Sequence, residues 1–209
     1  MFAQNPVFIP GPTNMPEVLR RAADMPTLDH RSSLFGQNLQ PALAGVKAVL
    51  KSADAEVFLF PSTATGGWET ALSNTLSEGD AVLAARYGMF SHRWIDMARR
   101  HRLDVRVTEA PSGEGLPADR SAEALAADKE HAIKAVLVPH HETATGVKSA
   151  VAPARRALAA TGHPALLLVA GRRSTPSTHF RLAAEQEAIQ FVPDALALRR
   201  LHALACRQP

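Results

Sequence analysis

Residues 60–68 read Phe60-Pro61-Ser62-Thr63-Ala64-Thr65-Gly66-Gly67-Trp68, a loop of small hydroxylic and glycine residues between two regular patterns. The apolar run 56–60 predicts a buried strand, and the amphipathic pattern 67–76 predicts a helix. A helix that begins in such a loop presents free backbone N–H groups, which bind a phosphate with the help of the helix dipole. The same residues also suit an ordinary capped helix with Thr63 or Thr65 as its N-cap, so both interpretations stay open.

The chain up to residue 169 repeats this alternation of short apolar runs and amphipathic stretches. The apolar runs predict further strands at 81–84, 103–107, 135–138 and 165–169. The amphipathic stretches predict further helices at 34–51, 90–100, 121–129 and 152–160, the first with Pro41 as a kink. Strands that alternate with helices in this way predict an α/β fold, with a mostly parallel sheet covered by helices on both faces.

Length and composition are those of a globular protein. The 209 residues allow one domain or a domain with an appendage, and 46% hydrophobic with 21% charged residues argue against collagen, coiled coil and bulk disorder. The single cysteine, Cys206, cannot form an internal disulfide, which favours a reducing compartment, and we predict a cytoplasmic protein. No apolar run reaches 18 residues and the first residues lack a signal-peptide pattern, so we predict no membrane partner.

The charge is unevenly distributed along the chain. The net charge is +3, but residues 150–209 hold eight arginines against three acidic residues, so they carry +5 and the remainder −2. None of the five lysines follows Lys148. An arginine-rich end can contact nucleic acid, but this one lacks interleaved aromatics and a binding motif, so we predict no nucleic-acid partner.

Two further motifs follow predicted strands. Residues 87–94, Tyr87-Gly88-Met89-Phe90-Ser91-His92-Arg93-Trp94, follow the strand 81–86. Because ligands of open α/β sheets bind at the carboxyl ends of the strands, Phe90 is placed to stack on a planar cofactor ring. A core aromatic that packs its helix on the sheet is the alternative.

The third motif, Pro139-His140-His141-Glu142-Thr143-Ala144-Thr145-Gly146-Val147, follows the strand 133–138. The pair His141-Glu142 does not extend to the zinc signature H-E-x-x-H, because Thr145 stands where the second histidine is required. The other histidines show no ligand spacing, so we predict no metal site. The hydroxyls of Thr143 and Thr145 suit a phenolic or carbonyl oxygen of a ligand.

Together with 9–14 and 28–31, these motifs resemble class V pyridoxal-phosphate aminotransferases, and most resemble the serine–glyoxylate branch of the alanine–glyoxylate aminotransferase group. The resemblance runs from about residue 6 to 169. It implies a fold type I large domain and a homodimer. It also implies transfer of an amino group from a small amino acid, serine or alanine, to glyoxylate, with pyridoxal 5'-phosphate as cofactor.

Carried over position by position, the resemblance assigns roles to eight residues. Thr63, Ala64 and Thr65 match the loop that holds the cofactor phosphate. Phe90 matches the aromatic that stacks on the pyridine ring, and Thr143 the hydroxyl that bonds its phenolic oxygen. The segment that lines the substrate pocket is matched by Gly11, Pro12 and Thr13.

The resemblance fails at two positions that the chemistry requires. The family's aspartate, which pairs with the pyridine nitrogen, is replaced by Ala170. The family's Schiff-base lysine would lie near residue 195, in a region without lysine. We therefore divide the chain into a truncated large domain, 1–169, and a divergent arginine-rich tail, 170–209.

Two interpretations of this departure remain. Either an aminotransferase gene has lost its reading frame or its end near residue 170, or the chain is a non-catalytic relative that binds a phosphorylated ligand. The lysine-free tail favours the first. In both cases we predict that the chain as given is inactive and holds the cofactor only weakly and without a covalent bond.

Overall fold

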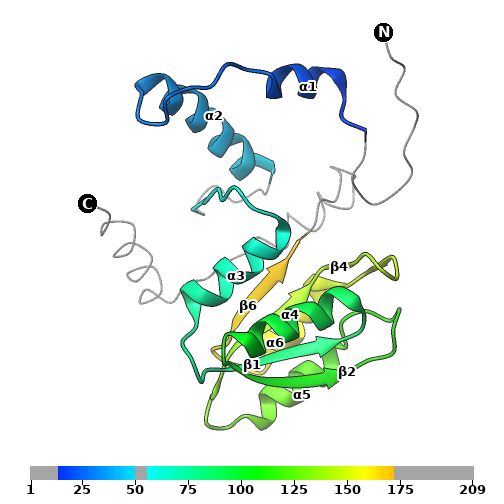
Figure 1. Ribbon diagram of the computed structural model, residues 1–209. Helices are drawn as coiled ribbons and strands as arrows, with labels where there is room; N and C mark the ends of the chain where they lie inside the picture. Colours follow the sequence, from blue (N-terminus) through cyan, green and yellow to red (C-terminus); the bar gives the residue numbers. More distant parts are fainter. Residues whose placement is uncertain (1–13, 50–55, 172–209) are drawn as a thin grey trace. The chain divides into compact units, whose positions relative to one another are not determined.

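A computed structural model describes residues 14–49 and 56–171 of the protein (Figure 1). The chain divides into two units, Met1–Val46 and Lys47–Pro209. The predicted boundary near residue 170 stays a prediction. Within the described ranges, no helix is long and apolar enough to cross a membrane.

The first unit consists of α1 (Glu17–Ala23) and most of α2 (Ser33–Val49). Glu17 pairs with Arg20 and Arg21 along the exposed face of α1. The second helix begins where the Ser32 hydroxyl accepts the Phe35 N–H at 3.2 Å. Its bounds agree with the predicted helix at 34–51, and Pro41 lies inside it.

A parallel sheet forms the centre of the second unit. Its strands are β1 (Ala81–Arg86), β2 (Asp104–Glu109), β3 (Ile133–Pro139) and β6 (Leu166–Ala170), in the order β2-β1-β3-β6. All three pairings are parallel, as predicted. The strands therefore all end at one side of the sheet, here called the carboxyl edge, and begin at the other, the amino edge.

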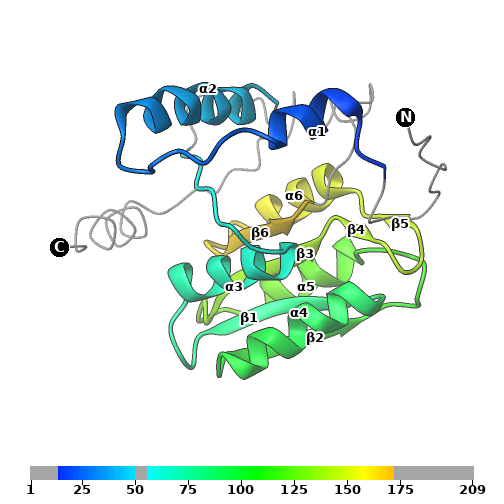
Figure 2. The same cartoon turned by 45° about the horizontal axis from the view of Figure 1, so that its top comes forward.

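Helices cover both faces of this sheet, which Figure 2 shows from a second side. The helices α3 (Ala64–Thr75) and α4 (Met89–Arg100) pack on one face, around a core that includes Leu72, Trp94 and Leu137. The helices α5 (Ala118–Ala127) and α6 (Val151–Ala160) pack on the other, around Leu83 and Val136. The predicted α/β architecture with helices on both faces is confirmed.

The predicted strand at 56–60 is wrong. These residues form no strand, and Phe58, Leu59 and Phe60 are 59%, 55% and 56% exposed. A strand needs a hydrogen-bonding neighbour, and in the described part of the chain no strand pairs with this segment. The apolar run has a high β propensity, but its pairing cannot be inferred from the run itself.

A hairpin that was not predicted follows β3. The strands β4 (His141–Glu142) and β5 (Val147–Lys148) pair antiparallel. The turn closes with the Gly146 N–H donating to the Glu142 carbonyl at 2.9 Å, and Gly146 adopts φ +74°, which favours glycine. Each strand has only two residues, which is too short to show the alternation of apolar and polar residues by which a strand is predicted.

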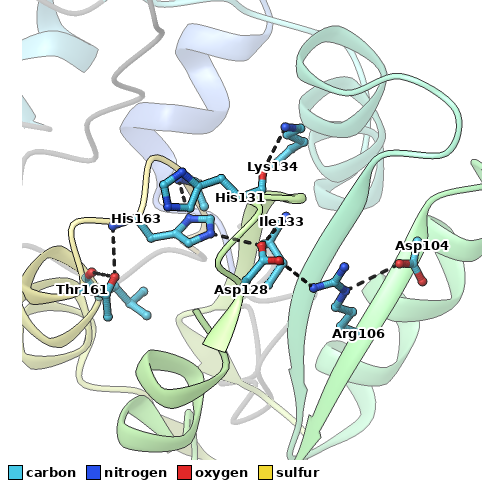
Figure 3. Close-up of polar contacts among 10 residues, drawn as sticks. Asp104, Arg106, Asp128, His131, Ile133, Lys134, Thr161 and His163 are labelled. Carbon is cyan, nitrogen blue, oxygen red and sulfur yellow. Dashed lines mark hydrogen bonds and ion pairs between the residues drawn. The ribbon is translucent and has the colours of Figure 1, made fainter. Parts of the chain in front are cut away.

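A polar cluster lies at the amino edge (Figure 3). Asp128 ends α5, and its carboxylate accepts the Ile133 N–H at 2.7 Å and an Arg106 N–H at 3.2 Å. The His163 Nδ1 accepts the Ala165 N–H, so the proton on its Nε2 points to Asp128, 3.2 Å away. The Ile133 N–H lowers the pKa of Asp128 against the opposing effect of burial, with further help from His163 and Arg106. The cluster ties α5 and the loop before β6 to two strands.

Candidate functional site

Two motifs predicted to carry chemistry lie at the carboxyl edge on neighbouring strands. Phe90 follows β1 and Thr143 follows β3, and these strands pair directly. The helix α3 is joined at its C-terminal end to the start of β1 by residues 76–80, and its N-terminal end lies toward the carboxyl edge, where Trp68 contacts Phe90. It begins at Ala64, three residues before the predicted start at residue 67, so the last residues of the hydroxylic loop form its first turn.

Direct contacts connect the three motifs. The Trp68 ring, in the second turn of α3, meets the Phe90 ring edge-on with centroids 6.2 Å apart. The Phe90 N–H donates to the carboxylate of Glu142, at 3.0 Å from Oε2 and 3.1 Å from Oε1. Thr143 is the next residue in the chain. The structure therefore brings the elements that carry Thr65, Phe90 and Thr143 to one place.

The N-terminus of α3 is open. Thr63 is the N-cap but its side chain makes no cap bond, and Thr63, Ala64 and Thr65 are exposed. The chain folds so tightly here that a Cβ on Gly66 would lie 1.9 Å from the Ser62 Oγ. Uncapped N–H groups, two hydroxyls and a glycine that permits close approach suit a phosphate. The residues present therefore fit the phosphate end of the predicted cofactor.

The N-terminus of α4 is closed by internal groups. The Ser91 hydroxyl accepts the N–H groups of Tyr87 and Gly88 at 3.0 and 2.9 Å. The Glu142 carboxylate, which is 0% exposed, accepts those of Phe90 and Ser91. The Tyr87 hydroxyl donates to the Pro139 carbonyl at 2.5 Å, and burial raises the pKa of Tyr87. These bonds fix the turn between β1 and α4 on the end of β3.

Two adjacent histidines follow β3. Burial, with smaller effects from His141 and Lys148, lowers the pKa of His140 to about 4, and burial also lowers that of His141. Both imidazoles are therefore neutral at physiological pH. Within the described ranges, no group of three or more His, Cys, Asp or Glu side chains is arranged to hold a metal ion.

Ala170 ends β6 at the carboxyl edge. It lies opposite Pro139 in the sheet, and its carbonyl accepts the His140 N–H at 3.0 Å. The position predicted to match the family's aspartate therefore lies at the same edge of the sheet as Thr143, on the neighbouring strand, but it carries a methyl group. The residues present do not fit the pyridinium end of the cofactor.

Several predicted features lie outside the described residues. These are the substrate-pocket segment Gly11, Pro12 and Thr13, and most of the tail, including the region near 195. The motif at 28–31 belongs to the first unit, where the Arg31 N–H donates to the Asp29 carboxylate at 2.9 Å.

The sequence did not predict that Glu142 is buried, nor the contacts that Trp68 and Ser91 make. Ser91 had a detectable signal, because it stands three residues after Gly88 at the start of a helix, the position from which a side chain reaches back to the N-cap. Glu142 gave no local signal, because its partners are 51 and 52 residues earlier in the chain.

Comparisons with known proteins identify relatives of this chain. No protein-family model matches. The chain is 66% identical to an L-aspartate–glyoxylate aminotransferase of Paracoccus denitrificans, over 87% of this chain and 46% of that protein. It is 51% identical to a serine–glyoxylate aminotransferase of Methylorubrum extorquens, over 85% of this chain and 44% of that protein. It therefore spans about half the length of these relatives.

Solved structures of aminotransferases share the fold of this chain. An alanine–glyoxylate aminotransferase from Nostoc sp. matches with a TM-score of 0.66 and 25% identity, over 80% of this chain and 45% of that one. An aspartate aminotransferase from Thermus thermophilus matches with a TM-score of 0.70 over 79% of this chain and 45% of that one, at 23% identity, which bears on the fold alone.

Proposed function

We propose that residues 56–171 form the cofactor-holding half of a glyoxylate aminotransferase, because the chain is a partial class V pyridoxal-phosphate aminotransferase related to the serine– and aspartate–glyoxylate aminotransferases. The observation that carries the proposal is the meeting of three motifs at the carboxyl edge. An open helix N-terminus, an aromatic ring and a hydroxyl lie on adjoining elements there.

Each group has a distinct task in this proposal. The backbone N–H groups of Thr63, Ala64 and Thr65 and the hydroxyls of the two threonines hold the phosphate. The Phe90 ring packs on the face of the pyridine, and the Thr143 hydroxyl bonds its phenolic oxygen. Pyridoxal phosphate, when bound, supplies an electron-accepting ring. The chain itself supplies orientation and excludes water from one face of that ring.

A binding titration tests the cofactor site. We expect the 209-residue chain to bind pyridoxal phosphate, and the quenching of Trp68 and Trp94 fluorescence measures this binding. Replacement Phe90→Ala should weaken binding by about threefold to tenfold, because it removes one stacking contact. The matched control is Phe35→Ala in the first unit, which should leave affinity unchanged. Equal affinities for the wild type and Phe90→Ala would refute the stacking role.

We further propose that the whole protein transfers an amino group to glyoxylate, the acceptor that the names of both relatives share. The donor is a small amino acid. A chimera of residues 1–169 with the matching remainder of the Paracoccus enzyme should transaminate glyoxylate, and comparison of aspartate, serine and alanine identifies the donor. A folded, cofactor-loaded chimera without turnover would contradict this.

The 209 residues as given should not transaminate. Ala170 offers no anion to the pyridine nitrogen, and no lysine follows Lys148. Loss of one proton-transfer group costs about 10²–10⁴-fold in rate, and the other losses lower the rate further without being strictly additive. Borohydride treatment after addition of pyridoxal phosphate, followed by peptide mapping, checks this. A label confined to one lysine, together with glyoxylate turnover, would contradict it.

Ala170 favours a second function, that of a non-catalytic relative that binds a phosphorylated ligand. Such a protein keeps the phosphate site at α3 without the pyridinium partner. Tight binding of pyridoxal phosphate that Ala170→Asp does not improve would favour this function. Improved binding of pyridoxal phosphate by Ala170→Asp would favour descent from an active aminotransferase. A homodimer and a cytoplasmic location stay predictions.

A further inference from the structure

Glu142 is a buried carboxylate that connects the ends of two strands. It is 0% exposed. In the described part of the chain, it is bonded by the N–H groups of Phe90 and Ser91, at 3.0–3.1 Å, and the Ser91 hydroxyl lies 3.5 Å away. A buried carboxylate is unfavourable unless hydrogen bonds and opposite charge compensate it. The compensation here comes from the positive N-terminal end of α4.

The residues around Glu142 leave room for it. The N-cap of α4 is Gly88, which has no side chain to cap the first turn. A Cβ at this position would lie 2.3 Å from both the Cγ and the Cδ of Glu142. The φ of Gly88 is 173°, an extended angle open to any residue, so the approach of Glu142 is what requires glycine. The cap of α4 therefore comes from β4 instead of from the helix's own N-cap.

We propose that Glu142 is a positioning residue for the cofactor ring. It holds Phe90 by its backbone N–H and immediately precedes Thr143, so one buried side chain sets the stacking ring and the hydroxyl relative to each other. The inference rests on the proposed function, because Phe90 and Thr143 are the groups proposed to hold the ring.

The same carboxylate decides which helix end accepts an anion. Two helix N-termini, those of α3 and α4, adjoin at the carboxyl edge through the Trp68–Phe90 contact. The end of α4 is occupied by a negative charge, which repels a phosphate and has taken up the N–H donors. At the end of α3 the N-cap side chain makes no cap bond, and the Gly66 N–H donates within the turn to the Thr63 carbonyl at 3.0 Å. Glu142 thereby directs the phosphate to Thr63–Thr65 and leaves Phe90 for the ring.

The first experiment uses the 209-residue chain without ligand. Trp68 contacts Phe90 and stacks on Trp94 with centroids 5.4 Å apart, so the near-ultraviolet circular dichroism of the tryptophans reports the position of Phe90. Glu142→Gln should change this spectrum while the far-ultraviolet spectrum is retained. Glu123→Gln, an exposed carboxamide substitution on α5, is the matched control and should change neither. If Glu142→Gln does not fold, Glu142→Asp, which draws the carboxylate back, serves instead.

The second experiment is a double-mutant cycle with pyridoxal phosphate as the probe. Glu142→Gln should weaken binding on the order of tenfold, the effect of one hydrogen bond to a charged group. In the Phe90→Ala background the same change should weaken binding by about twofold or less, because most of its effect is transmitted through Phe90 and only the part transmitted through Thr143 remains. A residue needed only for stability would give the same fold-change in both backgrounds.

The outcomes separate the two proposals. A changed near-ultraviolet spectrum with non-additive binding losses supports the positioning role. An unchanged spectrum in Glu142→Gln, or additive losses, overturns it. If the wild-type chain binds no pyridoxal phosphate, the proposed function of this unit fails. The ligand-free spectrum then still decides whether Glu142 sets the position of Phe90.

Discussion

At the scale of single residues, carboxylates that accept backbone N–H groups hold the second unit together at both edges of the sheet. Asp128 accepts the Ile133 N–H at the amino edge, and Glu142 accepts the Phe90 N–H at the carboxyl edge. Each connects elements that a strand pairing alone does not join. Both acceptors are buried, so removal of either leaves backbone donors without a partner.

Asp128 makes stability depend on pH. The folded state lowers its pKa, chiefly through the Ile133 N–H. Its contribution to the free energy of unfolding is therefore complete above the ordinary aspartate pKa, about 3.9, and is lost as the pH falls through the lowered value. Asp128→Asn should destabilise the protein at neutral pH and flatten this acid dependence.

Urea unfolding of the wild type and Asp128→Asn measures the pH dependence of the free energy of unfolding. The pH series should run from about 3 to 7, a range that spans the ordinary aspartate pKa. Asp119→Asn, an exposed aspartate on the same helix, is the matched control. Equal acid dependence in the wild type and Asp128→Asn would contradict the prediction.

At the scale of elements, two adjacent glycines in α3 differ in the space around them: a side chain would clash at Gly66 but not at Gly67. A Cβ on Gly66 would lie 1.9 Å from the Ser62 Oγ and 2.7 Å from its Cβ, whereas a Cβ on Gly67 would meet nothing within 4 Å. We expect Gly66→Ala to move the loop 62–65 and to weaken pyridoxal phosphate binding about tenfold or more, a loss comparable to one charged hydrogen bond.

Gly67→Ala is the control for this prediction. It should leave binding unchanged and stabilise the protein by about 0.5–1 kcal/mol, because alanine suits a helix interior better than glycine. Thermal unfolding and fluorescence titration of both variants measure the two effects. Equal cofactor affinities in Gly66→Ala and Gly67→Ala would show that the tight loop has no part in binding.

The elements were predictable where their evidence is local. The apolar runs at β1, β3 and β6 and the amphipathic stretches of α4 to α6 place those elements to within a few residues. Elements that depend on a partner were not predictable: the segment 56–60 has β propensity but no neighbour among the described strands, and β4 and β5 exist through each other. The same holds for the candidate site. Phe90 and Thr143 were predictable because they belong to recognisable local motifs, whereas Glu142 was not, because its bonding partner Phe90 lies 52 residues earlier in the chain.

At the scale of the whole molecule, apolar surface remains exposed. In the described part of the chain, β6 pairs only with β3, and Phe58, Leu59 and Phe60 are more than half exposed. A sheet edge and an exposed apolar segment both promote association. We expect the 209-residue chain to self-associate with rising concentration.

Sedimentation velocity over a range of protein concentrations checks this expectation. Phe58→Lys should reduce the association and change the free energy of unfolding by less than about 0.5 kcal/mol, as is usual for an exposed position. Val18→Lys, on the exposed face of α1, should reduce it less. A wild-type chain that stays monomeric throughout would contradict the prediction.

The strand order β2-β1-β3-β6 has a consequence for synthesis on the ribosome. β1 emerges first, β2 joins one side of it, β3 joins the other, and β6 then joins β3. Each later strand of the described sheet thus meets a neighbour that has already left the ribosomal tunnel. Such a sheet can grow outward from its centre during translation, which shortens the time that β1 and β3 spend unpaired and open to aggregation.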